Sequence, residues 1–176
     1  MINSYPSFKR PLRALPSSLV IIFFIIALLG FADAAYLTAE HYLQAIPPCT
    51  AGFSCATVLT SSYSTFLGIP VSLFGSFYYL VLALGSFAYL ESKHVAGEVK
   101  AHHHGILKAV LWFSAIGFLV SLYFLYVQAF VIHSFCEYCI GSAITSTLIF
   151  IMSVVILVRD AKAPDEPAAE ETPASI

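Results

Sequence analysis

Four cysteines carry the chemistry that this sequence can do, and they fall into two pairs. Cys136 and Cys139 form a C-x-x-C motif in Ser134-Phe-Cys-Glu-Tyr-Cys-Ile140, directly before a long apolar stretch, while Cys49 and Cys55 lie much earlier in the chain. Residues three apart lie on one face of a helix, and the first turn of a helix has unpaired N–H groups that stabilise a thiolate. The motif therefore predicts a reactive dithiol at a helix start, which exchanges electrons with the other pair.

Three interpretations of the two pairs fit their spacing. A disulfide within C-x-x-C closes a very short loop and hardly restrains the unfolded chain, so it is a poor structural staple and a better redox pair. Two structural disulfides are one alternative. A metal site is another, although it needs four converging thiolates, which an oxidising compartment disfavours. We favour the redox interpretation and expect no metal.

The elements that position the cysteines are apolar enough to cross a membrane. Hydrophobic residues make up 59% of the 176 residues and charged residues only 10%, whereas about a quarter is usual in soluble domains. Four apolar stretches are long enough to cross a hydrocarbon core about 30 Å thick. We therefore predict an all-α integral membrane protein, a four-transmembrane-helix bundle. Its expected spans are about 17–40, 70–91, 106–132 and 137–158.

The basic residues predict the orientation of these spans, because all eight lie at one set of span ends. They are Lys9, Arg10, Arg13, Lys93, Lys100, Lys108, Arg159 and Lys162. By the positive-inside rule both termini are cytoplasmic and both cysteine segments face outward, where disulfides persist. The net charge of −2 and the lack of a basic patch argue against a nucleic-acid partner.

The segments outside the bundle are expected to be polar. Residues 1–16 form a cytoplasmic lead, and residues 159–176, rich in Ala, Pro and Glu, form a disordered cytoplasmic tail. His102-His103-His104 is expected in a solvated cytoplasmic loop rather than in a metal site. Ala32-Asp33-Ala34 also permits a signal-peptide cleavage site, but the apolar pattern continues beyond it, so we favour a complete span.

Two polar residues near the first outward loop are functional candidates. Asp33 lies about two-thirds of the way through the first span, where a carboxyl costs about 2.5–3.5 kcal/mol on insertion scales. It serves either in proton handling near a redox site or in a packing hydrogen bond. The loop 41–69 is long enough to be functional, and we expect a short amphipathic helix at about 56–62 over the bundle mouth. Ser61 then ends that helix or contributes to the site.

The expected electron acceptor is lipid-soluble. The sequence has no G-x-G-x-x-G fingerprint for a nicotinamide cofactor. A bundle lined with Phe and Tyr side chains can hold a planar ring that enters from the lipid.

Several segments together resemble the vitamin K epoxide reductase (VKOR) family, over about residues 17–158. The resemblance is strongest to bacterial members that lack a fused thioredoxin-like domain. The segments are Asp33-Ala-Ala-Tyr-Leu-Thr38, Cys49-x5-Cys55, Ala56-Thr-Val-Leu-Thr-Ser61-Ser-Tyr-Ser-Thr-Phe-Leu-Gly-Ile-Pro70-Val-Ser-Leu-Phe-Gly75, and Ser134-Phe-Cys-Glu-Tyr-Cys139. The resemblance implies a four-helix bundle around a quinone in a bacterial inner membrane. It also implies that quinone reduction forms a disulfide in a periplasmic DsbA-like, thioredoxin-fold partner.

The resemblance also implies a role for each cysteine. Cys139 would lie beside the quinone ring and leave as a thiolate favoured by the helix N-terminus. Cys136 would be its disulfide partner and exchange with Cys55, while Cys49 would accept attack from the partner's thiols. Ser61 would match the loop serine or threonine of the family at the quinone.

Two departures from the animal members bear on the substrate. Ala143 stands where those members carry a tyrosine four residues after the motif, and Val71 stands in place of their asparagine. We therefore expect ubiquinone or menaquinone, rather than vitamin K epoxide, to be the substrate. DsbB-like proteins perform much the same reaction, but they place C-x-x-C in the first loop, the reverse of the order here.

Overall fold

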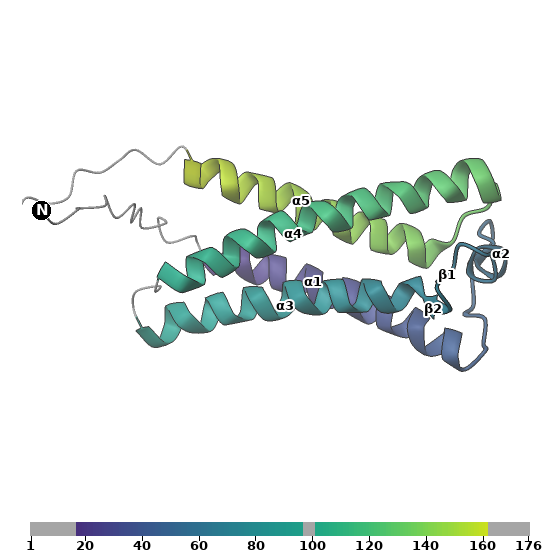
Figure 1. Ribbon diagram of the computed structural model, residues 1–176, viewed down its shortest axis with the longest axis horizontal. Coiled ribbons are helices and arrows are strands. Elements are labelled where there is room, and N and C mark those ends of the chain that lie inside the picture. Colours follow the sequence, from purple (N-terminus) through teal and green to yellow (C-terminus); the bar gives the residue numbers. More distant parts are fainter. Residues whose placement is uncertain (1–16, 97–100, 162–176) are drawn as a thin grey trace, which may run out of the picture.

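The computed structural model describes residues 17–96 and 101–161, and its long helices pack side by side as a bundle (Figure 1). In chain order each long helix packs against the next, and the last packs against the first, which closes the ring. All four are long and apolar enough to span a membrane, so the predicted multi-pass helical bundle is confirmed. The helices are α1 (Ser17–Tyr42), α3 (Val71–Ala96), α4 (Ala101–Tyr126) with its continuation η1 (Val127–Ile132), and α5 (Glu137–Ala161).

The observed helices extend beyond several expected boundaries. Helix α4 begins at Ala101, so His102–His104 lie in a helix and not in the loop that we expected. Helix α5 continues to Ala161, so the first three residues of the expected tail are helical. The expected lead 1–16 and the rest of the tail, 162–176, lie outside the described residues.

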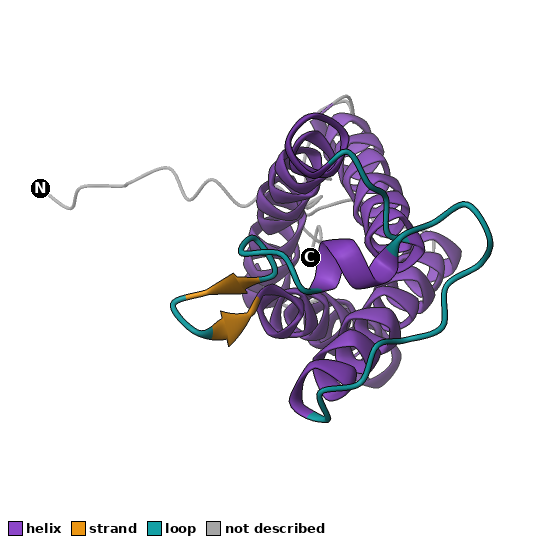
Figure 2. Ribbon diagram, turned by 90° about the vertical axis from the view of Figure 1, so that its right-hand side faces the viewer, coloured by secondary structure: helices purple, strands orange, loops and turns teal. Residues whose placement is uncertain are grey.

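The connection between α1 and α3 closes one end of the bundle. Helix α2 (Cys55–Leu59) lies across that end (Figure 2) and is shorter than the helix expected at 56–62, because the chain turns at Thr60 and Ser61. A small hairpin, which the sequence did not lead us to expect, then pairs β1 (Thr65–Phe66) with β2 (Ile69–Pro70). Its turn uses left-handed backbone at Leu67 and Gly68.

Hydroxyl pairs join the helices inside the bundle. Ser114 donates to Ser153 at 2.8 Å between α4 and α5, and Thr38 donates to Ser72 at 3.0 Å between α1 and α3. Such bonds matter between apolar helices, because lipid offers little hydrophobic drive for their association. Polar residues therefore hold together a bundle that is otherwise apolar.

Tyr79 of α3 connects three helices. It is 1% exposed, its ring lies against Gly30 of α1, and its hydroxyl donates to the Ser142 carbonyl of α5 at 2.7 Å. A Cβ at Gly30 would overlap the ring of Tyr79. The glycine therefore sets the spacing of α1 and α3.

Gly30→Ala is expected to destabilise the bundle by about 1–3 kcal/mol, because the added methyl overpacks against Tyr79. Thermal unfolding of purified protein in detergent measures this as a lower transition temperature. Gly141→Ala in α5 is the matched control, since a Cβ there meets nothing within 4 Å and alanine favours helix. Equal unfolding temperatures for Gly30→Ala and the wild type would contradict the packing role of Gly30.

Candidate functional site

All four cysteines pack in one cluster beside α2, with Cys55 and Cys136 at its buried centre. Cys49 and Cys55 are joined by a disulfide, with their Cα atoms 6.0 Å apart. Cys136 and Cys139 are free thiols in hydrogen-bond contact with each other. Cys55 and Cys136 are 1% and 0% exposed, so each is screened from solvent within the same packed cluster. The fold thus brings together the two pairs that the sequence separates by about eighty residues.

A backbone hydrogen bond places the two pairs next to each other. The N–H of Ser54 donates to the carbonyl of Phe135 at 2.8 Å, and each of these residues directly precedes a cysteine. Cys55 then begins α2, and Cys136 directly precedes α5. The starts of the two helices are therefore held side by side.

The two residues inside the C-x-x-C motif hold the segment around Cys49. The hydroxyl of Tyr138 donates to the Pro48 carbonyl at 2.9 Å. Glu137 accepts hydrogen bonds from both the backbone N–H and the hydroxyl of Thr50. A carboxylate oxygen of Glu137 also lies within 4.8 Å of both sulfurs of the outer disulfide. Sequence reasoning missed both residues, for which the only signal was their place between the two cysteines.

The pKa of Cys136 is lowered from an ordinary value of 9.0 to about 7. The largest cause is a hydrogen bond from the Cys139 thiol, and the backbone N–H groups of Cys139 and Tyr138 add to it, whereas burial opposes it. We expected the helix N-terminus to favour a thiolate at Cys139. In the structure its N–H groups stabilise the sulfur of Cys136 instead.

Gln128 organises the connection that leads into the motif. Its carbonyl accepts the N–H groups of His133 and Ser134, and its side-chain oxygen accepts the N–H of Cys136 at 2.9 Å. Gln128 lies in η1, a π-helical segment, and such segments occur frequently at functional sites. A polar residue eight positions before the motif gave no recognisable signal in the sequence.

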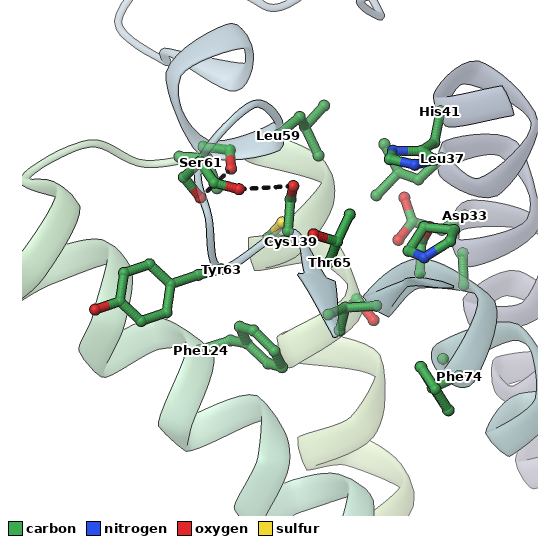
Figure 3. Close-up of a pocket in the computed structure, with 18 of the residues that line it drawn as sticks. Asp33, Leu37, His41, Leu59, Ser61, Tyr63, Thr65, Phe74, Phe124 and Cys139 are labelled. Carbon is green, nitrogen blue, oxygen red and sulfur yellow. Dashed lines mark hydrogen bonds between the residues drawn. The ribbon is translucent and has the colours of Figure 1, made fainter. Parts of the chain in front are cut away.

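A cavity of about 860 Å³ extends from this cluster into the bundle. Asp33 and Leu37 line it from α1, Phe124 from α4, and Ser61 from the turn after α2 (Figure 3). Apolar and aromatic walls with a few polar groups are typical of sites for small organic ligands, so the lining fits a quinone. Oδ2 of Asp33 is buried and has no hydrogen-bond partner among the described residues.

Cys139 belongs to both features, because it packs in the cysteine cluster and also lines the cavity. The sequence-derived candidates Asp33 and Ser61 line the same cavity. The hydroxyl of Ser61 donates to the Val58 carbonyl at 2.7 Å, which is the helix-ending role that the sequence also allowed. The arrangement therefore places one thiol of the inner pair both beside the outer disulfide cluster and on the wall of the cavity.

The family model that describes the vitamin K epoxide reductase family matches residues 21–154, and the chain therefore belongs to this family. Its members are membrane oxidoreductases that act on disulfides and quinones, and this class of function applies to the chain. Comparison with individually curated proteins gave no significant match.

The lowered pKa of Cys136 predicts that about half of its thiol is ionised at neutral pH, far more than for an ordinary cysteine. In a variant whose other cysteines are replaced (Cys49→Ala, Cys55→Ala, Cys139→Ser), the ultraviolet absorbance of the thiolate should rise with a midpoint near pH 7. One pH unit below that midpoint, about a tenth of the Cys136 thiols are ionised.

A second variant carries Cys139→Ala in place of Cys139→Ser. It lacks the main hydrogen-bond donor to Cys136, so its midpoint should rise toward the ordinary value. The account of this shift is wrong if both variants titrate together near 9.0.

Proposed function

We propose that the chain is a thiol oxidase that reoxidises a periplasmic DsbA-like, thioredoxin-fold partner and transfers the electrons to a membrane quinone. The observation that carries the proposal is the position of Cys139, which lies both in the cysteine cluster and on the cavity wall. In this proposal the cysteine cluster accepts the electrons of the partner, and the cavity binds ubiquinone or menaquinone.

The first step takes electrons from the partner. A partner thiolate attacks Cys49, which forms a mixed disulfide and releases Cys55 as a thiolate. The partner's second thiol then attacks the partner's sulfur in the mixed disulfide. This closes the disulfide of the partner and releases Cys49 as a thiolate. The partner thus loses two electrons and two protons, and the outer pair gains them. Tyr138 and Glu137 support this step, since they hold the backbone on both sides of Cys49.

The second step moves the electrons inward. The Cys55 thiolate attacks Cys136 of the oxidised inner pair, and Cys139 leaves as a thiolate. Cys49 then attacks Cys55, which restores the outer disulfide and leaves the inner pair reduced. A bound quinone supplies the two-electron acceptor. Cys136 and Cys139 close their disulfide as they give up two electrons and two protons.

Two further residues serve the quinone site in this proposal. Ser61 lines the cavity and contacts the ligand from the turn after α2. Asp33 handles protons at the buried Oδ2, which is unpartnered among the described residues and lies on the same cavity wall. A carboxyl without a local partner is suited to exchange a proton with a ligand oxygen.

The proposed location is the bacterial inner membrane, with both termini cytoplasmic and the cysteine cluster on the periplasmic side. The starts of α2 and α5 lie at one end of the bundle, while the basic residues of the sequence occur near the other helix ends. This distribution supports the orientation through the positive-inside rule.

Quinone reduction by purified protein in detergent tests the proposal. With a reduced thioredoxin-fold protein and either ubiquinone-1 or menadione, the wild type should consume quinone, followed by its absorbance. Cys139→Ser and Cys49→Ala should each lower turnover by about 10³-fold or more, because each removes a nucleophile of a relay that acts as a unit.

Thr57→Ala is the control for this assay, since Thr57 is exposed on α2 and does not line the cavity. Absence of turnover in the wild type with both quinones and several partners would favour structural disulfides, or a metal-binding protein if purified samples hold an ion in stoichiometric amount. Unchanged turnover in Cys139→Ser would exclude the relay.

A further inference from the structure

The side-chain amide of Gln128 has a protein partner for its oxygen but none for its NH2 group among the described residues. Its Oε1 accepts the N–H of Cys136. Because a backbone N–H can only donate, it must face the amide oxygen, and the NH2 group therefore points the other way. Among the described residues, that amide nitrogen donates no hydrogen bond. Gln128 is 2% exposed and lines the cavity. A donor that has no protein partner on a residue lining the cavity is suited to bind a ligand there.

Two other donors that line the cavity are already engaged. The hydroxyl groups of Ser61 and Tyr79 donate to the backbone carbonyls of Val58 and Ser142 at 2.7 Å each. The amide of Gln128 differs because its bond to Cys136 uses only its acceptor. Its donor is therefore left for the ligand.

The backbone also holds Gln128 in place. Its carbonyl accepts two N–H groups, from His133 and Ser134, where the π-helical turn ends. The side chain is thus fixed at both ends, by these backbone bonds and by Cys136. Cys139, three residues further on, lines the same cavity. The amide donor and the reducing sulfur are consequently held in a constant relation to each other.

We propose that Nε2 of Gln128 donates a hydrogen bond to a carbonyl oxygen of the quinone, while Oε1 positions Cys136. This inference rests on the proposed function. The quinone oxygens gain negative charge as two electrons arrive, so an N–H donor stabilises the reduced ligand more than the oxidised one. Gln128 gives up no proton, and both protons come from the thiols or other acids of the site.

The amide can be observed directly, because Gln44 and Gln128 are the only glutamines of the chain. Protein with ¹⁵N-labelled glutamine side chains, oxidised so that no turnover occurs, is titrated with menadione in detergent. The amide protons assigned to Gln128 by their loss in Gln128→Met should move downfield and saturate with the ligand. Resonances of Gln128 that stay unmoved at saturating menadione would overturn the inference.

A comparison of two ligands separates ligand contact from a purely structural role. Gln128→Met should weaken menadione binding by about three- to tenfold, the usual loss for one neutral hydrogen bond. It should leave binding of 2-methylnaphthalene, which has the same ring system without carbonyls, unchanged relative to the wild type. Equal weakening of both ligands, or of neither, would show that Gln128 acts on the protein alone.

The same titration distinguishes this inference from the proposed function. If the wild type binds no menadione, the quinone site itself is refuted. If the wild type binds menadione and Gln128→Met binds it equally well, the quinone site stands and the role of Gln128 falls.

Discussion

The hydrogen bond from the Ser54 N–H to the Phe135 carbonyl is the constraint on which the arrangement of the two cysteine pairs depends. It joins the segment between α1 and α2 to the connection between η1 and α5, one residue before Cys55 and one before Cys136. Hydrogen bonds to Thr50 and Pro48 and the Cys49–Cys55 disulfide also hold the loop around Cys49. The proximity of the two pairs therefore depends on loop docking as much as on the cysteines.

The molecule separates two tasks between two kinds of structure. The bundle is apolar outside and joined inside by hydroxyl pairs such as Ser114 with Ser153, which gives a stable wall for the cavity. The connection between α1 and α3, which closes one end of the bundle, has little regular structure: only α2 and a two-stranded hairpin. Cys139 lies where the two parts meet, so it packs in the cysteine cluster and also lines the cavity.

Much of the fold could be predicted because membrane spans have a strong sequence signal. Twenty or so apolar residues are required to cross the hydrocarbon core, and the four spans were found within a few residues of their observed bounds. The hairpin at Thr65–Pro70 and the helical position of His102–His104 were missed. Strands of two residues have no measurable periodicity, and a polar run at a helix start resembles a loop.

The site was predicted unevenly for a related reason. Cysteine pairs and a carboxyl within an apolar helix are rare enough to be noticed from the sequence alone. Gln128, Glu137 and Tyr138 act through bonds to residues far away in the chain, and their types are common in any sequence. Which sulfur faces the first N–H groups of α5 depends on the exact start of the helix, which is the least predictable feature of a helix. That start at Glu137 directs the N–H groups to Cys136 and not to Cys139.

The most direct test of the account is whether Cys55 and Cys136 can form a disulfide in the folded protein. The variant Cys49→Ala with Cys139→Ala keeps only these two thiols, and mild oxidation followed by mass spectrometry of unreduced peptides detects the bond. We expect nearly complete formation of a Cys55–Cys136 disulfide, because both sulfurs lie in one buried cluster. If both thiols remain free and are alkylated only after denaturation, the pairs do not exchange electrons and the relay is refuted.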